Sequence, residues 1–125
     1  MIVDTSALIA VLRREPEADR FVDRLLATSE VRISAGTFLE IRIVAERDDG
    51  GAELDELMEA VGIEVVPVDA RHVELAFDGF RRFGKGRHPA GLNFGDLFAY
   101  GLARALDEPL LSKGDDFNRT DIKAA

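Results

Sequence analysis

The alternation of apolar and polar positions predicts a strand followed at once by a helix at the start of the chain. Residues 1–3 are apolar, and residues 4–6 are Asp-Thr-Ser, three residue types that favour helix N-caps. Apolar residues then recur at helical spacing as far as Leu12. The first twelve residues therefore predict a strand, a tight turn and a helix.

The same strand-and-helix alternation continues to the end of the chain. Helices are predicted from about residue 16 to 26, 34 to 47, 53 to 61, 69 to 80 and 94 to 106, and strands at 31–34, 63–68, 109–111 and, as a short fifth strand, 121–123. Glycine and proline make residues 83–92 a loop. Such alternation implies a parallel sheet with helices on both faces, and ligands gather at the carboxyl ends of its strands.

Length and composition limit the chain to one domain, residues 1–125. With 125 residues and 46% hydrophobic content it can bury one core. Cysteine is absent, which excludes disulfides and thiolate metal ligands and makes a reducing cytoplasm the expected location. The start of the chain has no basic region followed by a long hydrophobic segment, so neither export nor membrane spanning is expected.

The net charge argues against general binding to a polyanion, but one segment of the chain is basic. The charge is −8, from 24 acidic and 16 basic residues. Cations cluster near the middle of the chain, at Arg81, Arg82, Lys85, Arg87 and the neighbouring His88. This flexible basic segment is suited to guiding phosphates. An ordinary solvated helix end and loop explains it equally well.

Asp4 and Glu40 occupy positions that suit catalytic or metal-binding residues. Asp4 follows the first strand, at the edge where open α/β sheets bind ligands; alternatively it only caps a helix. Glu40 lies one turn into a helix among apolar residues, where a carboxylate is costly to bury without a partner. The alternative there is a salt bridge to Arg42 or Arg47.

Two further acidic positions lie near predicted element ends. Asp96 begins the most hydrophobic helix, although Asn93 as N-cap with Asp96 as the third helical residue is an equally good explanation. Asp115 and Asp116 follow the predicted strand at 109–111, and the alternative is a polar turn. Mg²⁺ prefers hard oxygen ligands and is usually held by one or two carboxylates together with substrate phosphate. Acids that converge on one sheet edge would fit that requirement, and substrate oxygens could complete a second metal site.

Four ordered segments carry a resemblance to a known family. They are residues 2–8 (IVDTSAL), 34–40 (SAGTFLE), 92–96 (LNFGD) and 110–117 (LLSKGDDF), the last followed by Thr120-Asp121-Ile122. With these segments at suitable separations from end to end, the chain resembles the PIN-domain ribonucleases, and more closely the VapC-type toxins of bacterial toxin–antitoxin pairs.

The resemblance implies a three-layer α/β/α PIN fold with a central, mostly parallel sheet of four to five strands. It implies that Asp4, Glu40 and Asp96 are the catalytic acids and hold Mg²⁺ or Mn²⁺, whose water attacks the scissile phosphorus of RNA. Thr5 or Ser6 would orient a ligand or water through a hydrogen bond, and Asn93 and Ser112 are further supporting candidates. The family implies an endoribonuclease toxin, an antitoxin that covers the site, and a homodimer.

The last motif departs from the usual family pattern. Many PIN domains place an acid two residues after the Ser112 position, where this chain has Gly114. Asp115 is therefore expected as the fourth catalytic acid, with Asp116 as the alternative. The departure also gives some support to a PIN-fold binding module that has lost activity.

Two other protein classes share part of the pattern. A haloacid-dehalogenase-type phosphatase also begins with a strand that ends in a nucleophilic aspartate, but it needs a second acid where this chain has Ser6. A signalling receiver domain would have paired acids at the first strand, where this chain has Asp4 alone. Both classes are therefore disfavoured.

Overall fold

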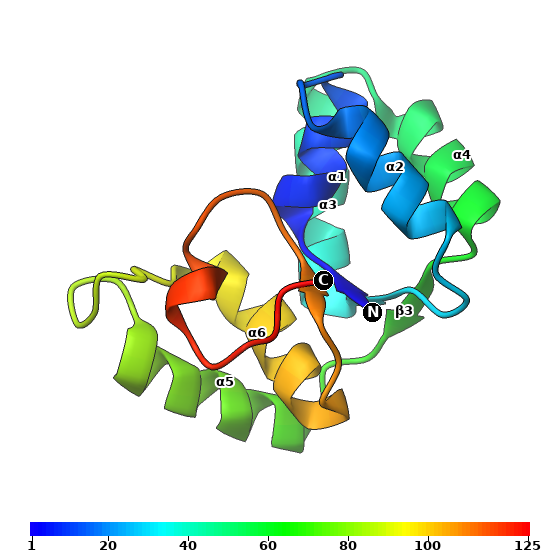
Figure 1. Ribbon diagram of the computed structural model, residues 1–125. Coiled ribbons are helices and arrows are strands. Elements are labelled where there is room, and N and C mark those ends of the chain that lie inside the picture. Colours follow the sequence, from blue (N-terminus) through cyan, green and yellow to red (C-terminus); the bar gives the residue numbers. More distant parts are fainter.

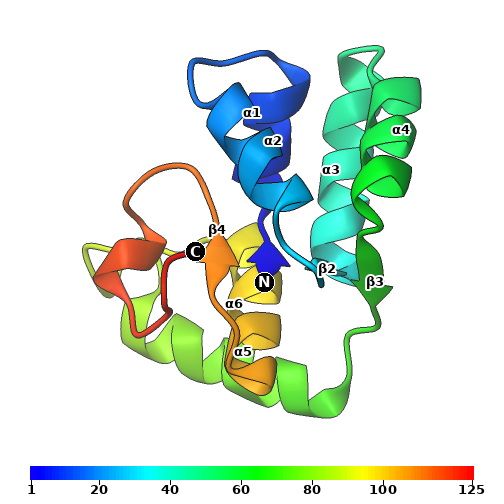
Figure 2. The same cartoon turned by 45° about the vertical axis from the view of Figure 1, so that its right-hand side comes forward.

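A computed structural model describes residues 1–125 and contains one parallel sheet. Its strands are β1 (Ile2–Val3), β2 (Arg32–Ser34), β3 (Glu64–Val66) and β4 (Leu110–Leu111), in the order β3-β2-β1-β4 (Figure 2). The four predicted strands are confirmed. The predicted fifth strand at 121–123 is wrong: the tail joins β4 only through an isolated bridge between Leu110 and Ala124, a contact too short for a ladder.

Six helices cover the sheet in two layers. They are α1 (Thr5–Leu12), α2 (Ala18–Leu26), α3 (Ala35–Arg47), α4 (Gly51–Val61), α5 (Ala70–Phe83) and α6 (Phe94–Leu106), with a 3₁₀ turn η1 (Phe117–Arg119) near the end. Helices α1 to α4 lie on one side of the sheet and α5 and α6 on the other (Figures 1 and 2). The three-layer α/β/α arrangement is therefore confirmed. None of these helices has the length and apolar character needed to cross a membrane.

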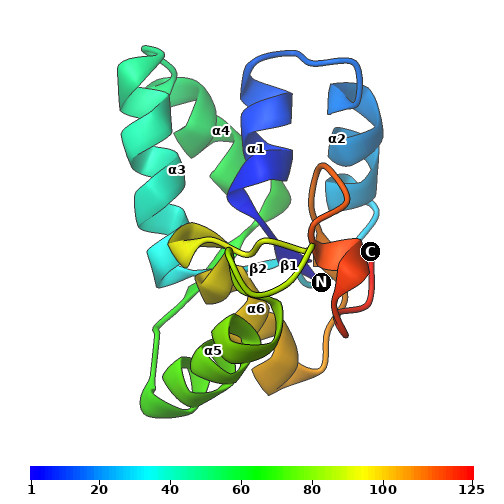
Figure 3. The same ribbon diagram turned by 90° about the vertical axis from the view of Figure 1, so that its left-hand side faces the viewer.

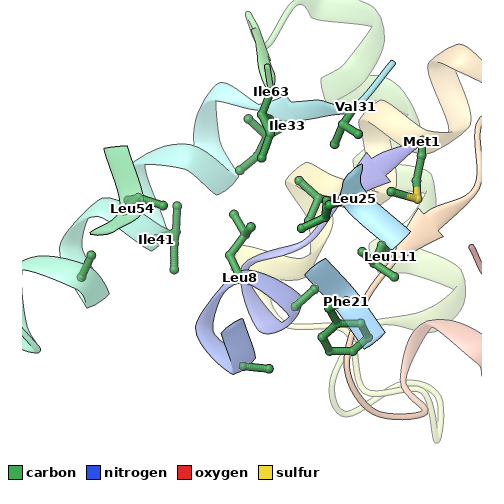
Figure 4. Close-up of a cluster of buried hydrophobic side chains, with 14 residues drawn as sticks. Met1, Leu8, Phe21, Leu25, Val31, Ile33, Ile41, Leu54, Ile63 and Leu111 are labelled. Atoms are coloured by element: carbon green, nitrogen blue, oxygen red, sulfur yellow. The ribbon is translucent and has the colours of Figure 1, made fainter. Parts of the chain in front are cut away.

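The sheet separates two hydrophobic cores, because successive side chains of a strand point to opposite faces. Met1 packs into the core beneath α1 to α4 (Figure 4). Val3 belongs to the same core, whereas Ile2 packs against α6. Leu111 and Leu110 divide between the cores in the same way. Both faces of β1 and β4 are buried, which explains why the sequence of each strand is an uninterrupted apolar run.

Three helix N-termini meet near the carboxyl ends of the central strands. β1 runs through Asp4 into α1, β2 runs through Ser34 into α3, and the start of α6 lies beside α3 (Figure 3). Gly36 makes the α3–α6 contact possible, since a Cβ there would lie 2.3 Å from the Phe98 ring. The fold thus brings residues near positions 4, 40 and 96 to one edge of the sheet.

Candidate active site

Asp4 caps α1 and is almost completely buried, with 4% of its surface exposed. The amide and the hydroxyl of Ser6 donate to its Oδ2 at 3.0 and 2.7 Å. Burial raises the pKa of Asp4, the Ser6 hydrogen bonds oppose that rise, and the negative charge of Glu40 adds to it. The capping alternative is therefore real, but both of these hydrogen bonds use one carboxylate oxygen.

Glu40 is held by a neighbour of Asp4. The Thr5 hydroxyl donates to Glu40 Oε1 at 2.5 Å, and a Cβ at Gly95 would lie only 2.2 Å from Oε2. The carboxylate therefore lies between the start of α1 and the backbone of α6. The predicted alternative of a salt bridge is wrong, because Arg42 pairs with Asp55 at 3.0 Å and Arg47 forms no ion pair.

Asp96 caps α6 together with Asn93. The backbone amide of Asn93 donates to Asp96 Oδ2, and the backbone amide of Asp96 donates to Asn93 Oδ1, both at 2.9 Å. These two hydrogen bonds complete a capping box. Burial raises the pKa of Asp96 to about 6, against the opposing effect of the Asn93 hydrogen bond. The charges of Asp4, Asp116 and Glu40 are smaller contributors to this same rise, so these acids share one electrostatic environment.

The loop after β4 separates its two adjacent aspartates. Asp116 acts on Asp96 through its charge, whereas Asp115 accepts a 3.5 Å hydrogen bond from Asn118. Asp115 and Ser112 both line a separate groove against α2. The charge of Asp116 thus acts on Asp96, whereas Asp115 and Ser112 line the groove beside α2.

Lys113 fixes this loop to the start of α1. Its backbone amide donates to Ser6 Oγ at 2.9 Å, and its ammonium pairs with Glu15 and with Glu17, the latter at 3.4 Å. Ser6 therefore links the loop to Asp4. Two hydroxyls hydrogen-bond to acids of this region: that of Thr5 to Glu40 and that of Ser6 to Asp4.

No protein cation balances this acidic site, which comprises Asp4, Glu40, Asp96 and Asp116. None of the four forms an ion pair with lysine, arginine or histidine. The structure also contains no group of three or more acidic or histidine side chains arranged to ligate one ion directly. Carboxylates that repel one another, from the buried Asp4 and half-buried Asp96 to the exposed Glu40 and Asp116, fit a hard divalent cation bound by one or two carboxylates and several waters. The donor set therefore suits Mg²⁺ or Mn²⁺ in a partly hydrated state.

The basic segment is not uniform. Arg82 is already paired with Asp78 and Asp121, at 3.3 and 3.1 Å. Arg81 and Arg87 lie over the rings of Phe77 and Phe80, 5.9 and 4.9 Å from the ring centres. Lys85 lines a groove between α5 and α6 together with Asn93 and Phe94. His88 accepts a hydrogen bond from the Ala90 amide within its own loop. Lys85 is thus the cation of this segment that shares a groove with the start of α6.

A model of the PIN domain matches residues 1–123. The chain belongs to the PIN-domain family. It is a VapC-type member: Ribonuclease VapC30 of Mycobacterium tuberculosis is 44% identical over 98% of this chain and 95% of its own length. Ribonuclease VapC28 of the same organism is 46% identical over 100% and 97%, and Ribonuclease VapC of Mycolicibacterium smegmatis is 44% identical over 99% and 98%. The predicted resemblance is confirmed.

Solved structures show the same fold. VapBC2 from Rickettsia felis, bound to a DNA fragment from its promoter, superposes with a TM-score of 0.74 at 14% identity, covering 99% of this chain and 96% of that one. A toxin–antitoxin complex from Klebsiella pneumoniae gives 0.72 at 16% identity over 93% and 88%. The PIN fold removes the phosphatase and receiver alternatives.

Three residues of this PIN domain site had not been singled out from the sequence. Gly95 gives Glu40 room, Lys113 anchors the last loop, and Phe94 stands exposed beside the acids. A glycine just before a helix-start acid could have indicated close packing. Nothing in the spacing of Lys113 or Phe94 reveals their neighbours, because those contacts join segments far apart in the chain.

Proposed function

We propose that this VapC-type PIN domain is an endoribonuclease that requires Mg²⁺ or Mn²⁺ and acts as the toxin of a toxin–antitoxin pair. The ribonuclease names of relatives at 44–46% identity support this proposal. The observation that carries it is the gathering of Asp4, Glu40, Asp96 and Asp116 at one sheet edge without a protein cation.

The ligand assignment follows from which carboxylate oxygens the protein already uses. Asp4 and Asp96 would hold the metal ion, since each accepts its capping hydrogen bonds on Oδ2. Glu40 would bind directly or through water, and Asp116, rather than Asp115, would be the fourth acid. A bound divalent ion supplies Lewis-acid activation of the attacking water and charge neutralisation at the phosphate.

The protein's own groups hold these acids in place. Ser6 donates two hydrogen bonds to Asp4, Thr5 donates one to Glu40, and the Asn93 amide donates one to Asp96. Hydrogen bonds from behind fix the orientation of ligands in metal sites. Without a cation, the carboxylates would repel an RNA phosphate. Metal dependence therefore follows from the charge of the site.

The test is RNA cleavage by the purified protein with Mg²⁺ or Mn²⁺ and with a chelator. Asp4→Asn should abolish cleavage and keep the fold, as judged by circular dichroism. The adjacent aspartates provide a matched pair: Asp116→Asn should reduce cleavage strongly and Asp115→Asn should change it little. Cleavage in the presence of the chelator would contradict the proposal. RNA binding without cleavage would indicate the inactive binding module.

We also propose a cognate antitoxin that covers the acidic site and a homodimer of this chain. The solved neighbours are complexes of toxins with antitoxins, which supports a protein partner. Exposed apolar side chains such as Val73 and Phe77 on α5, both more than half exposed, are typical of interaction surfaces. Light scattering with size exclusion would show a monomer mass if the homodimer is wrong.

A further inference from the structure

Phe94 is the most exposed of the large hydrophobic side chains, at 77%. It is the first residue of α6 and lies two positions before Asp96. Leaving a phenylalanine in water forgoes the stabilisation of burying it. The most exposed ring of the protein thus stands immediately beside the proposed catalytic acids.

The position of this ring is fixed relative to those acids. Phe98 packs against it edge to face, with 5.1 Å between ring centres and 79° between planes. The capping box of Asn93 and Asp96 holds the backbone on either side of it. Gly95, the next residue, packs directly on the Glu40 carboxylate. The ring therefore offers a stable flat surface at the edge of the acidic site.

Two hollows meet at Phe94, and each contains a cation with no acidic partner. One hollow is lined by Glu40, Gly95 and Arg47, and the other is a mainly apolar groove between α5 and α6 that also includes Asn93 and Lys85. Phe94 and Phe98 line both. Neither Arg47 nor Lys85 forms an ion pair, although the net charge of the chain is −8. A polyanion that crosses Phe94 would meet a positive charge on either side.

We propose that the face of Phe94 stacks on an unpaired nucleobase next to the phosphodiester that is cleaved, while Arg47 and Lys85 contact the flanking phosphates. Proteins that bind single-stranded RNA commonly stack splayed bases on aromatic rings and follow the backbone with cations. The inference rests on the proposed ribonuclease function and adds a binding role for three residues to it. The substrate is then RNA with an unstacked nucleotide at the cleavage position.

The first experiment separates binding from chemistry. The substrate is the RNA that the wild-type protein cleaves fastest, selected from a random-sequence pool and from bulk tRNA. With this RNA, Phe94→Ala should raise KM about 5- to 100-fold with a smaller change in kcat. Phe94→Trp should retain activity. Leu106→Ala, which truncates an exposed apolar residue at the far end of the same helix, is the matched control and should leave KM unchanged.

The second experiment observes stacking directly. The chain has no tryptophan, so Phe94→Trp in an Asp4→Asn background gives a single tryptophan, which can be excited selectively over Tyr100, in a protein that binds without cleaving. The same RNA should quench the tryptophan fluorescence to a saturating level. An abasic nucleotide at the cleavage position should weaken RNA binding to the protein with Phe94 but not to Phe94→Ala. Arg47→Ala and Lys85→Ala should each reduce the salt dependence of binding by about one phosphate contact. Arg42→Ala, which removes a paired cation from α3, should not.

The outcomes distinguish this inference from the function on which it rests. If wild-type protein cleaves no RNA, the proposed function fails and the inference fails with it. If wild-type protein cleaves RNA but Phe94→Ala has an unchanged KM, only the inference is overturned. If the Phe94→Ala protein becomes monomeric and still binds RNA as tightly as wild type, Phe94 belongs to a protein interface and the inference is overturned.

Discussion

Two acidic clusters lie at opposite parts of α6, and they differ in what balances their charge. At the N-terminal end, the negative charges of Asp4, Glu40 and Asp116 act on Asp96. Farther along, Asp121 from the C-terminal segment accepts hydrogen bonds from Tyr100 at 2.8 Å, Arg104 at 3.0 Å and Arg82 at 3.1 Å. The first cluster contains only carboxylates, and the second matches its carboxylate with two guanidinium groups and a hydroxyl.

The difference separates an acid that is balanced within the fold from the acids proposed to bind a metal ion. A partly buried carboxylate is stabilised when cations and donors meet it, as they meet Asp121. The acidic site retains its repulsion, which capping hydrogen bonds and helix N-termini offset only in part. The protein therefore maintains an unfavourable charge distribution at one end of α6 that a bound cation would relieve.

The largest expected difference between the two clusters is the loss of RNA cleavage when an aspartate of each is replaced. Asp96→Asn should lower the rate of RNA cleavage by about 100- to 1,000-fold, as expected when one group that stabilises transition-state charge is removed. Asp121→Asn should keep the rate within severalfold of wild type, because it touches no acid of the site. Initial rates at saturating Mg²⁺ measure both. Equal losses in the two variants would mean that the clusters do not differ in function.

Two glycines allow the same comparison through packing. A Cβ at Gly95 would lie 2.2 Å from Glu40 Oε2, and one at Gly79 would lie 2.3 Å from the buried Tyr100 ring. Gly95→Ala should displace a flexible carboxylate and reduce cleavage about 10- to 100-fold with little change in stability. Gly79→Ala should instead destabilise the fold by about 1–3 kcal/mol and spare the rate. Urea unfolding and cleavage rates, measured on both variants, would reveal any reversal.

The contrast between the clusters also shows what the sequence could predict. Every helix and the four strands of the sheet followed from periodicity and capping residues, since those signals are local. The acids at positions 4, 40 and 96 were found because each lies at an element start or among apolar neighbours. The choice between Asp115 and Asp116 could not be made, because it depends on how one loop turns.

The pairing of Asp121 was also outside the reach of the sequence. Its segment was predicted as a strand, yet the side chain is engaged by α5 and α6, and the backbone pairs with β4 only at residues 123–125. Likewise, the basic segment gave no sign that Arg82 is committed to Asp121 while Lys85 is free. Patterns identify elements, whereas side-chain partners depend on tertiary packing.

The paired cluster should contribute measurably to stability. Asp121→Asn leaves Arg82 and Arg104 with Asp78 as a remaining acidic partner, at 3.3 and 3.7 Å, so the loss is partial. We expect a decrease of about 1–2 kcal/mol in the free energy of unfolding, below the value for a fully buried pair. Urea denaturation gives the value, and Asp107→Asn, which removes an exposed ion pair with Lys123, serves as the control with a smaller effect.

The unpaired cluster should instead make the metal-free protein less stable as pH rises. The folded pKa of Asp96 is about 6, above the unfolded value of 3.8, so the folded state holds the proton more tightly. The resulting stabilisation is fully present below about pH 4 and is lost as pH rises through 6. Because Asp96 is partly exposed, we expect a change of about 1–2 kcal/mol. Urea unfolding in chelator across this range should show it, and Asp96→Asn should flatten the profile.

Divalent metal provides the opposing arm of this last experiment. Protons and the cation compete for the same carboxylates, so stabilisation by Mg²⁺ should grow as pH rises through 6. Asp121→Asn should leave that growth intact, whereas Asp96→Asn should diminish it. A metal effect independent of pH in wild type would mean that the ion does not bind where the carboxylates repel one another, and the distinction between the two ends of α6 would lose its functional meaning.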